Sequence, residues 1–304
     1  MTEAIRFYCG ITEKVWNYFP VSPGKYGCVA PVFGSTEKTR QESRVYVPDD
    51  VSIIQDSGAF CDSINNRLSY QQALDRQRYH AEKYNYVNKM THRVSYDLLI
   101  DEKWIDGKRT KQRWDTKDAD YAVDETLRAA EFISNNRDGT NLVLSAQGVT
   151  KEQYIRCTKE IMPMMDINKD IFGMGGWCII GRYKTAMIPM FDDILFDLIP
   201  MLGENKIKKV HIFGVVYAKA LGHLLWMCDK YNIQLSTDSS GPQKRPAFGQ
   251  WGYAEWRDKS YVRPPTSIRG QERAKHVQAV IGWLSDFRNT KWYEPPNKKE
   301  ENND

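Results

Sequence analysis

The stretch Val-Ser-Ile-Ile-Gln-Asp-Ser-Gly-Ala-Phe at positions 51–60 sets the interpretation of the whole chain. An apolar, β-branched run ends here in Asp56, and Gly58 follows where a tight exit from a strand is needed. Parallel α/β folds present catalytic groups at the C-terminal ends of such buried strands. We therefore expect a strand that delivers Asp56 to a site. For a single aspartate, helix capping or turn formation is the competing role.

The same pattern recurs along the chain. Other segments that favour strands are residues 5–9, 28–33, 93–99, 141–146, 170–176, 208–214 and 233–237. Segments that favour helices are residues 69–84, 117–135, 150–165, 190–202, 217–231 and 266–287, with Thr116 and Thr150 as candidate N-caps. This alternation predicts an α/β fold, a (β/α)8 TIM barrel. A doubly wound open sheet is the alternative, but polar residues at the ends of at least five strands favour a closed ring that converges on one site.

The length of 304 residues suits one barrel, because such domains fill about 250 residues. We expect a single domain over residues 1–290 and a disordered tail over residues 291–304. No apolar stretch approaches the roughly 18 residues that span a bilayer, and the first residues do not resemble a secretory signal. A cytoplasmic protein without membrane attachment is therefore expected.

The six cysteines show neither Cys-x-x-Cys pairs nor histidines at zinc-site spacing, so we expect reduced thiols and no metal. The net charge is only +4, which means that a polyanionic partner would be held by local patches. Residues 243–263, directly after the last strand, form an irregular segment that mixes basic and aromatic side chains. Such a mixture suits nucleic-acid backbones and unstacked bases, and an ordered loop capping the barrel is the alternative. Its candidate nucleic-acid contacts are Lys244, Arg245, Arg257, Lys259 and Arg263.

The expected strand ends supply a specific set of groups. In chain order they are Asp56, Asp97, Gln147, Gly175 with Gly176, Phe213 and Asp238. Carboxylates, an amide, exposed backbone and an aromatic ring are what a site for a purine-like base needs, because they accept and donate hydrogen bonds at its edge and stack on its faces. One carboxylate more than recognition requires is left for chemistry.

These motifs, in this order, resemble the tRNA-guanine transglycosylases and their DNA-modifying relatives. The resemblance rests on Asp-Ser-Gly-Ala-Phe at 56–60, Asp97, Gln147-Gly148, Gly175-Gly176, Phe-Gly-Val at 213–215 and Asp238, and it covers roughly residues 50–241. It implies a β/α barrel that exchanges guanine in a polynucleotide for a free 7-deazaguanine base, with no cofactor.

The resemblance also implies a role for each residue. Asp238 would attack C1′ of the target sugar and hold a covalent intermediate, as a carboxylate does in retaining glycosidases. Asp56 would be the general acid and base. Base binding would fall to the residues around them, namely Ser57, Gly58, Phe60, Asp97, Gln147, Gly148, Gly175, Gly176 and Phe213, with Phe60 and Phe213 covering the two faces of the base.

The chain departs from the tRNA enzymes of this family in one main respect. Those enzymes carry a cysteine- and histidine-bound zinc site after the nucleophile strand, and here that region has no cysteine. Ala59 and Val149 also stand where glycines are usual. The shortened chain is most similar to the DNA-modifying branch, so we expect DNA as the partner, with 7-cyano-7-deazaguanine as one base it inserts. Exchange in tRNA is an alternative, as is a catalytically silent nucleic-acid-binding subunit.

Overall fold

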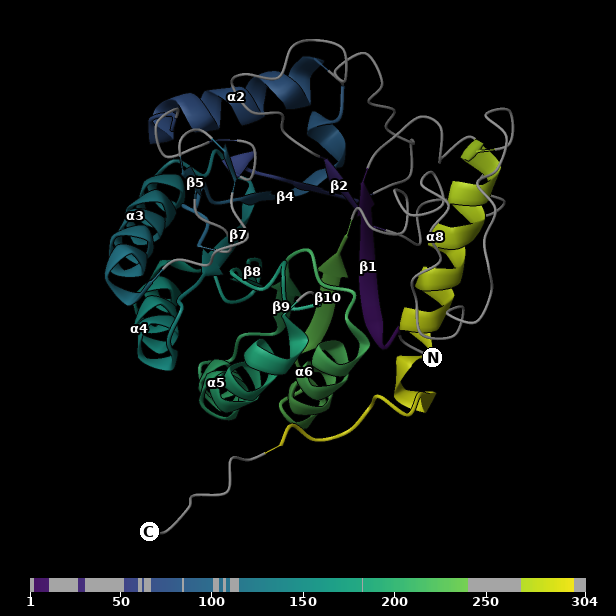
Figure 1. Cartoon of the computed structure of the whole chain (residues 1–304). Coiled ribbons are helices and arrows are strands. Elements are labelled where there is room, and N and C mark those ends of the chain that lie inside the picture. The colour runs from purple at the N-terminus through teal and green to yellow at the C-terminus, as the bar shows by residue number, and fades with distance from the viewer. Residues whose placement is uncertain are drawn as a thin grey trace.

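The structure is a computed structural model of the 304-residue chain (Figure 1). It describes residues 3–10, 27–30, 52–59, 62, 67–83, 85–100, 104–105, 108–109, 115–181, 183–239 and 269–297. The strands are β1 (Ile5–Gly10), β2 (Gly27–Ala30), β3 (Ile53–Gln55), β4 (Met90–Val94), β5 (Trp104–Ile105), β6 (Lys108–Arg109), β7 (Asn141–Ala146), β8 (Ile171–Met174), β9 (Lys209–Ile212) and β10 (Gln234–Asp238). The helices are α2 (Tyr70–Lys83), α3 (Thr116–Asn135), α4 (Lys151–Ile161), α5 (Lys184–Glu204), α6 (Ala218–Lys230) and α8 (Arg269–Ser285), with short 3-10 turns at Val87–Lys89, Met162–Met164 and Phe287–Asn289.

Eight of these strands form a closed barrel in which every neighbouring pair is parallel. The order around the ring is β1-β2-β3-β4-β7-β8-β9-β10, and β10 returns to β1 through the register pair Tyr8 and Asp238. The remaining two, β5 and β6, pair with each other as a small antiparallel hairpin. The predicted (β/α)8 barrel is confirmed. The alternative, a doubly wound open sheet, is excluded because such a sheet has two unpaired edge strands, whereas here β1 and β10 pair and close the ring.

The helices form an outer layer around the barrel (Figure 1). Successive helices from α2 to α6 contact one another side by side, while α8 packs on β1. The Thr150 side chain caps α4 by accepting a hydrogen bond from the Gln153 N–H, as predicted. The prediction for Thr116 was wrong, because Asp115 caps α3 and Thr116 is its first residue. A carboxylate at this position also suits the positive end of the helix dipole.

Two apolar layers hold the barrel together. The larger lies between the strands and the helices and includes the fully buried Phe172, Phe191 and Trp177. A smaller cluster joins one side chain from each of five strands, namely Tyr8, Ile54, Val94, Val143 and Ile171, with Phe213 packed against it. Strands that are not neighbours meet in this way only inside the barrel, so this cluster fills its interior and forms a floor beneath the C-terminal rim.

The end of the chain corrects one prediction. Residues 291–297, expected to be part of a disordered tail, are packed against the helix layer: the Tyr293 hydroxyl lies 2.9 Å from Asp229, and the Asn297 N–H donates to Asp192 at 3.2 Å. Gly222 accommodates this segment, because a Cβ there would lie 1.6 Å from the Trp292 carbonyl oxygen. The polar composition predicted disorder, but Trp292 and Tyr293 supply apolar contacts that anchor the backbone.

No helix in the described part of the chain has the length and hydropathy needed to cross a bilayer. The predicted nucleic-acid contacts Lys244, Arg245, Arg257, Lys259 and Arg263, and the predicted base-covering Phe60, lie outside the described residues.

Candidate active site

The residues predicted for the site lie at one rim of the barrel. Asp56 follows β3, Asp97 lies three residues beyond β4, Gln147 follows β7, Gly175 follows β8, Phe213 follows β9 and Asp238 ends β10. Because the strands are parallel, all of these C-terminal ends face the same side, where the loops of a β/α barrel build its site. The structure therefore brings together six strand ends that are up to 182 residues apart in sequence (238 − 56).

Asp56 and Asp238 are close enough to influence each other's charge. The pKa of Asp56 is raised to about 6, chiefly because burial disfavours the ionised carboxylate and next because Asp238 carries a like charge. Hydrogen bonds from the Ser57 and Gly58 N–H groups, with the more distant charge of Arg76, act in the opposite direction without cancelling the shift. A carboxyl group with this pKa exchanges its proton readily near neutral pH, as a general acid and base must.

Asp238 is held by two nitrogen atoms that both contact the same oxygen. Its Oδ1 lies 2.9 Å from the Gly214 backbone nitrogen and 3.2 Å from His211 Nε2. The Asp238 side chain retains 22% of its exposure, whereas His211 is completely buried beneath it. The second oxygen, Oδ2, receives no hydrogen bond from the described residues and is the part of this carboxylate left for a ligand.

The turn after β9 depends on Gly214. Its φ of +69° is a left-handed conformation, and a Cβ there would lie 2.8 Å from Cys178 Sγ. A larger residue would strain the backbone and collide with the neighbouring loop. Glycine thus allows this N–H group to point at Asp238.

Helix α2 fixes the position of the Asp56 loop. Gln77 Nε2 donates to the carbonyl oxygens of Asp56, at 3.1 Å, and Val94, at 3.0 Å, and so links the ends of β3 and β4. Arg76 donates to the Ser57 carbonyl oxygen at 2.8 Å and forms a buried ion pair with Asp62 at 3.0 Å. These contacts hold the backbone at Asp56 and at the residue that follows it.

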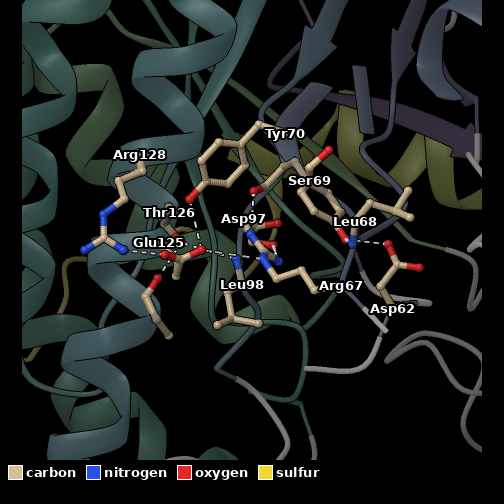
Figure 2. Close-up of polar contacts among 12 residues, drawn as sticks. Asp62, Arg67, Leu68, Ser69, Tyr70, Asp97, Leu98, Glu125, Thr126 and Arg128 are labelled. Carbon is tan, nitrogen blue, oxygen red and sulfur yellow. Dashed lines mark hydrogen bonds and ion pairs between the residues drawn. The ribbon is translucent and has the colours of Figure 1, made fainter. Parts of the chain in front are cut away.

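A second arginine holds the backbone at Asp97. Arg67 donates to the carbonyl oxygens of Asp97, at 2.8 Å, and Tyr96, at 3.0 Å, and its guanidinium also lies over the Tyr96 ring. Glu125, on α3, is 3.9 Å from Arg67 on the far side (Figure 2). The Asp97 carboxylate faces the glycine turn after β8, because a Cβ on Gly175 would lie 3.7 Å from Asp97 Oδ2. A carboxylate beside a glycine is suited to the donor edge of a flat base, because the glycine has no side chain to stand between them.

The side-chain amide of Gln147 is not free to donate to a base, contrary to the expectation from the sequence. Its Nε2 donates to the Leu98 carbonyl oxygen, at 2.5 Å, and to Thr126 Oγ1, at 2.7 Å, so both amide hydrogens are engaged (Figure 2 shows Leu98 and Thr126). Its Oε1 is buried without a partner among the described residues, so Gln147 has only an acceptor left to offer. Gly148 serves close packing, because a Cβ there would lie 2.6 Å from the Tyr154 backbone nitrogen.

The floor of the site is made by Phe213 and by small residues of β8. Phe213 contacts the buried His211 ring edge-to-face, with centroids 4.7 Å apart, and remains partly exposed. Its ring reaches over Gly173, where a Cβ would lie 2.9 Å from Phe213 Cε2. Gly176 follows with a φ of +79°. Gly175 and Gly176 are both buried, and Gly175 uses its N–H for the Ala146 carbonyl oxygen and its own carbonyl oxygen for the Tyr154 hydroxyl. The expectation of exposed backbone for base binding was therefore wrong at Gly175, and Phe213 provides one aromatic face beside the carboxylates.

The residues that hold the strand ends were not predicted from the sequence, namely Arg67, Arg76, Gln77 and His211. For His211 a signal existed: it lies two residues before Phe213 in a strand, so both side chains point to the same face. For Gln77 the signal was a polar residue on the buried face of α2, beside Ala73, Leu74 and Ala81. Within the described ranges, no three histidine, cysteine, aspartate or glutamate side chains gather closely enough to hold a metal ion.

Comparisons with known proteins support the fold alone. No protein-family model matches the chain, and no curated protein is similar to it in sequence. The structure is similar to one described as a fructose-1,6-biphosphate aldolase from Coccidioides immitis, with a TM-score of 0.53 and 10% identity over 94% of this chain and 91% of that one. It also matches a D-psicose 3-epimerase solved in the presence of D-fructose, with a TM-score of 0.43 and 10% identity over 91% of this chain and 99% of that one. The first of these likenesses agrees with the (β/α)8 barrel.

Proposed function

We propose that this protein is an enzyme, a transglycosylase that exchanges guanine in DNA for a free 7-deazaguanine base such as 7-cyano-7-deazaguanine. The observation that carries the proposal is the pair Asp56 and Asp238 at the barrel rim: two interacting carboxyl groups with different surroundings. One has a pKa raised to about 6, and the other is oriented through a single oxygen. Unlike environments assign unlike roles to paired carboxyl groups.

In the first half-reaction, an Asp238 oxygen forms a bond to C1′ of the target sugar while the bond from C1′ to guanine N9 breaks. The electron pair of that bond goes to the guanine, which takes a proton from Asp56. In the second half-reaction, N9 of the 7-deazaguanine loses its proton to Asp56 and bonds to C1′, and the carboxylate of Asp238 is released. The proton balance closes because Asp56 gives one proton and regains one.

The surrounding residues fit a planar base. Asp97, held by Arg67, would accept from the ring N–H and amino groups of guanine, and Phe213 would cover one face. Phe60 on the other face, and the basic residues of 243–263 on the nucleic-acid backbone, stay predictions from the sequence. A target inside a duplex would have to be flipped out of the stack to reach this rim.

Incorporation of a labelled base tests the proposal. The full chain is incubated with labelled 7-cyano-7-deazaguanine and either duplex DNA or tRNA, and the label retained in the polymer is measured. A duplex made only of A·T pairs is the matched control, because it offers no guanine to exchange. We expect label in guanine-containing DNA alone.

Each other outcome has a defined meaning. Label in tRNA and not in DNA would support the same base-exchange reaction, with tRNA in place of DNA as the substrate. Binding of nucleic acid without label in either polymer, under conditions where a covalent adduct also fails to form, would show a silent binding subunit and overturn the proposal.

A further inference from the structure

His211 is fixed on every side beneath Asp238. It lies in β9, where it is the register partner of Ser236 in β10. Its Nδ1 is 3.0 Å from Ser236 Oγ, and its Nε2 is 3.2 Å from Asp238 Oδ1. The ring packs edge-to-face against Tyr8 and Phe213, with centroids 5.6 Å and 4.7 Å away. A buried imidazole held in this way has one orientation available.

The hydrogen atoms in this chain of contacts can be counted. Ser236 Oγ is 3.1 Å from the Val210 carbonyl oxygen, which can only accept, so the serine hydroxyl donates there. Ser236 Oγ then accepts from His211 Nδ1–H. The remaining contact joins Nε2 to a carboxyl oxygen, and it also needs a hydrogen between the two atoms. All three hydrogen bonds form together only when the imidazole carries a hydrogen on each nitrogen, that is, as the imidazolium cation, with Nε2–H donating to Asp238 Oδ1.

The two donors to Asp238 make its oxygens unequal. His211 Nε2 and the Gly214 N–H both contact Oδ1, and Oδ2 is left without a donor from the described residues. We propose that His211 is a positioning residue that, with the Gly214 amide, holds Oδ1 so that Oδ2 is the attacking atom, and that it speeds the breakdown of the covalent intermediate. This inference rests on the proposed transglycosylase function.

The direction of the effect follows from the charge on Oδ1. In the glycosyl ester, Oδ1 is a carbonyl oxygen with little negative charge. When the bond between C1′ and Oδ2 breaks, its electron pair returns to the carboxylate and the charge on Oδ1 grows. Donors aimed at Oδ1 stabilise that developing charge, as in an oxyanion hole. In the first half-reaction the same donors stabilise the attacking carboxylate itself, so their loss does not slow attack to the same extent.

The test separates the two half-reactions with the full-length chain and guanine-containing DNA. Formation of the covalent protein–DNA adduct is followed on denaturing gels, and its decay is followed after labelled 7-cyano-7-deazaguanine is added. For His211→Leu we expect adduct decay to slow by about tenfold or more, with adduct formation changed by less than about threefold. The adduct should therefore accumulate. His211→Gln, whose amide can place a donor near the Nε2 position, should restore most of the decay rate.

A second buried histidine provides the matched control. His92 lies in β4 with contacts from Nδ1 to Thr91 and from Nε2 to the Lys169 carbonyl oxygen, both at 3.0 Å, so neither ring nitrogen contacts Asp238. His92→Leu removes a buried imidazole in the same way, and the ratio of adduct decay to formation should stay at the wild-type value. If His211→Leu does not fold, Ser236→Ala, which removes the partner of Nδ1, should slow decay in the same direction by a smaller factor.

Two results would overturn the inference, and they are distinguishable. In the first, the wild type is active but His211→Leu or Ser236→Ala keeps the wild-type ratio of adduct decay to adduct formation. This result would leave the transglycosylase proposal intact and rule out the proposed role of His211. A wild type that forms neither adduct nor labelled DNA would remove both.

Discussion

The part of the chain that the structure describes contains two histidine–aspartate pairs in different places. His211 and Asp238 lie on neighbouring strands at the barrel rim, 3.2 Å apart. His223, on α6, and Asp192, on α5, lie 2.6 Å apart in the outer helix layer. In both pairs the histidine is completely buried. The aspartates differ, because Asp238 retains 22% exposure of its side chain and Asp192 only 1%.

The difference that matters is what each aspartate has left to offer. Asp192 uses Oδ1 for His223 and Oδ2 for the Asn297 N–H, so its acceptors are engaged and inaccessible. Asp238 receives both of its donors on Oδ1. The first pair ties the end of the chain to two helices, and the second leaves one oxygen open at the mouth of the barrel. A histidine–aspartate pair therefore indicates a reactive site only where an exposed acceptor remains.

Each pair also has a second carboxyl group nearby. At the rim it is the half-buried Asp56, whose pKa is raised by burial and by the charge of Asp238. In the helix layer it is Glu294, 48% exposed and 3.5 Å from His223 Nε2. The first arrangement places two carboxyl groups close together at some cost in stability, whereas in the second the additional carboxyl group is exposed to solvent. Carboxyl groups whose pKa is shifted by burial and by a neighbouring like charge, at a cost in folding stability, are typical of functional sites.

The largest effect is expected at Asp238. Asp238→Asn keeps an acceptor for the Gly214 N–H but removes the nucleophilic carboxylate, so exchange should fall by about a thousandfold or more. Label incorporation into DNA and thermal unfolding, measured on the same preparation, check this. Near-normal exchange in a folded Asp238→Asn protein would show that Asp238 is not the attacking group.

The same chemical change in the other pair should act on stability. Asp192→Asn weakens a buried, charge-assisted hydrogen bond, so the free energy of unfolding should fall by about 1–3 kcal/mol. Exchange should stay within about twofold of wild type. Chemical denaturation measures the stability, and label incorporation measures the exchange. A loss of exchange without a loss of stability would show that Asp192 acts in the reaction, as Asp238 is proposed to do, and not in the fold.

A third prediction concerns Asp56 and pH. Its folded-state pKa, about 6, lies above the ordinary 3.8, so the protonated form stabilises the fold. That contribution is fully present below about pH 4 and is lost as pH rises through 6. Asn carries no charge, so Asp56→Asn should match wild-type stability below about pH 4 and exceed it at pH 8. The shift corresponds to about 1–2 kcal/mol once partial solvation is allowed for.

Denaturation at pH 4 and at pH 8 measures this difference, and exchange in the same variant should be lost. A variant that is less stable than wild type at pH 8 would contradict the burial of a destabilising charge at the rim. The comparison also separates function from folding, because the same substitution raises stability while it removes activity.

The strand ends were predictable because they depend on local pattern. Buried parallel strands need apolar runs, and the chain marks the end of each with a polar residue or glycine, as at Asp56 and Gly175. The contacts that hold those ends were not predictable, because Arg67 and Gln77 bind carbonyl oxygens that lie far along the chain from them. Every residue carries a backbone carbonyl oxygen, so the sequence does not show which of them a distant side chain binds. The engagement of both Gln147 amide hydrogens was hidden for the same reason.

The smallest effect is expected at Glu294, and it tests whether the second pair is purely structural. Glu294 is half exposed, so its attraction to His223 is screened by water and salt. Glu294→Gln should lower the free energy of unfolding by less than about 1 kcal/mol, and the difference should shrink further in high salt. Denaturation at low and high ionic strength measures it, with Asp192→Asn as the reference for a buried partner. A salt-independent loss as large as that of Asp192→Asn would mean that Glu294 is a full partner of His223, and the helix-layer pair would then be a closed triad whose dry interior depends on residues 291–297 staying in place.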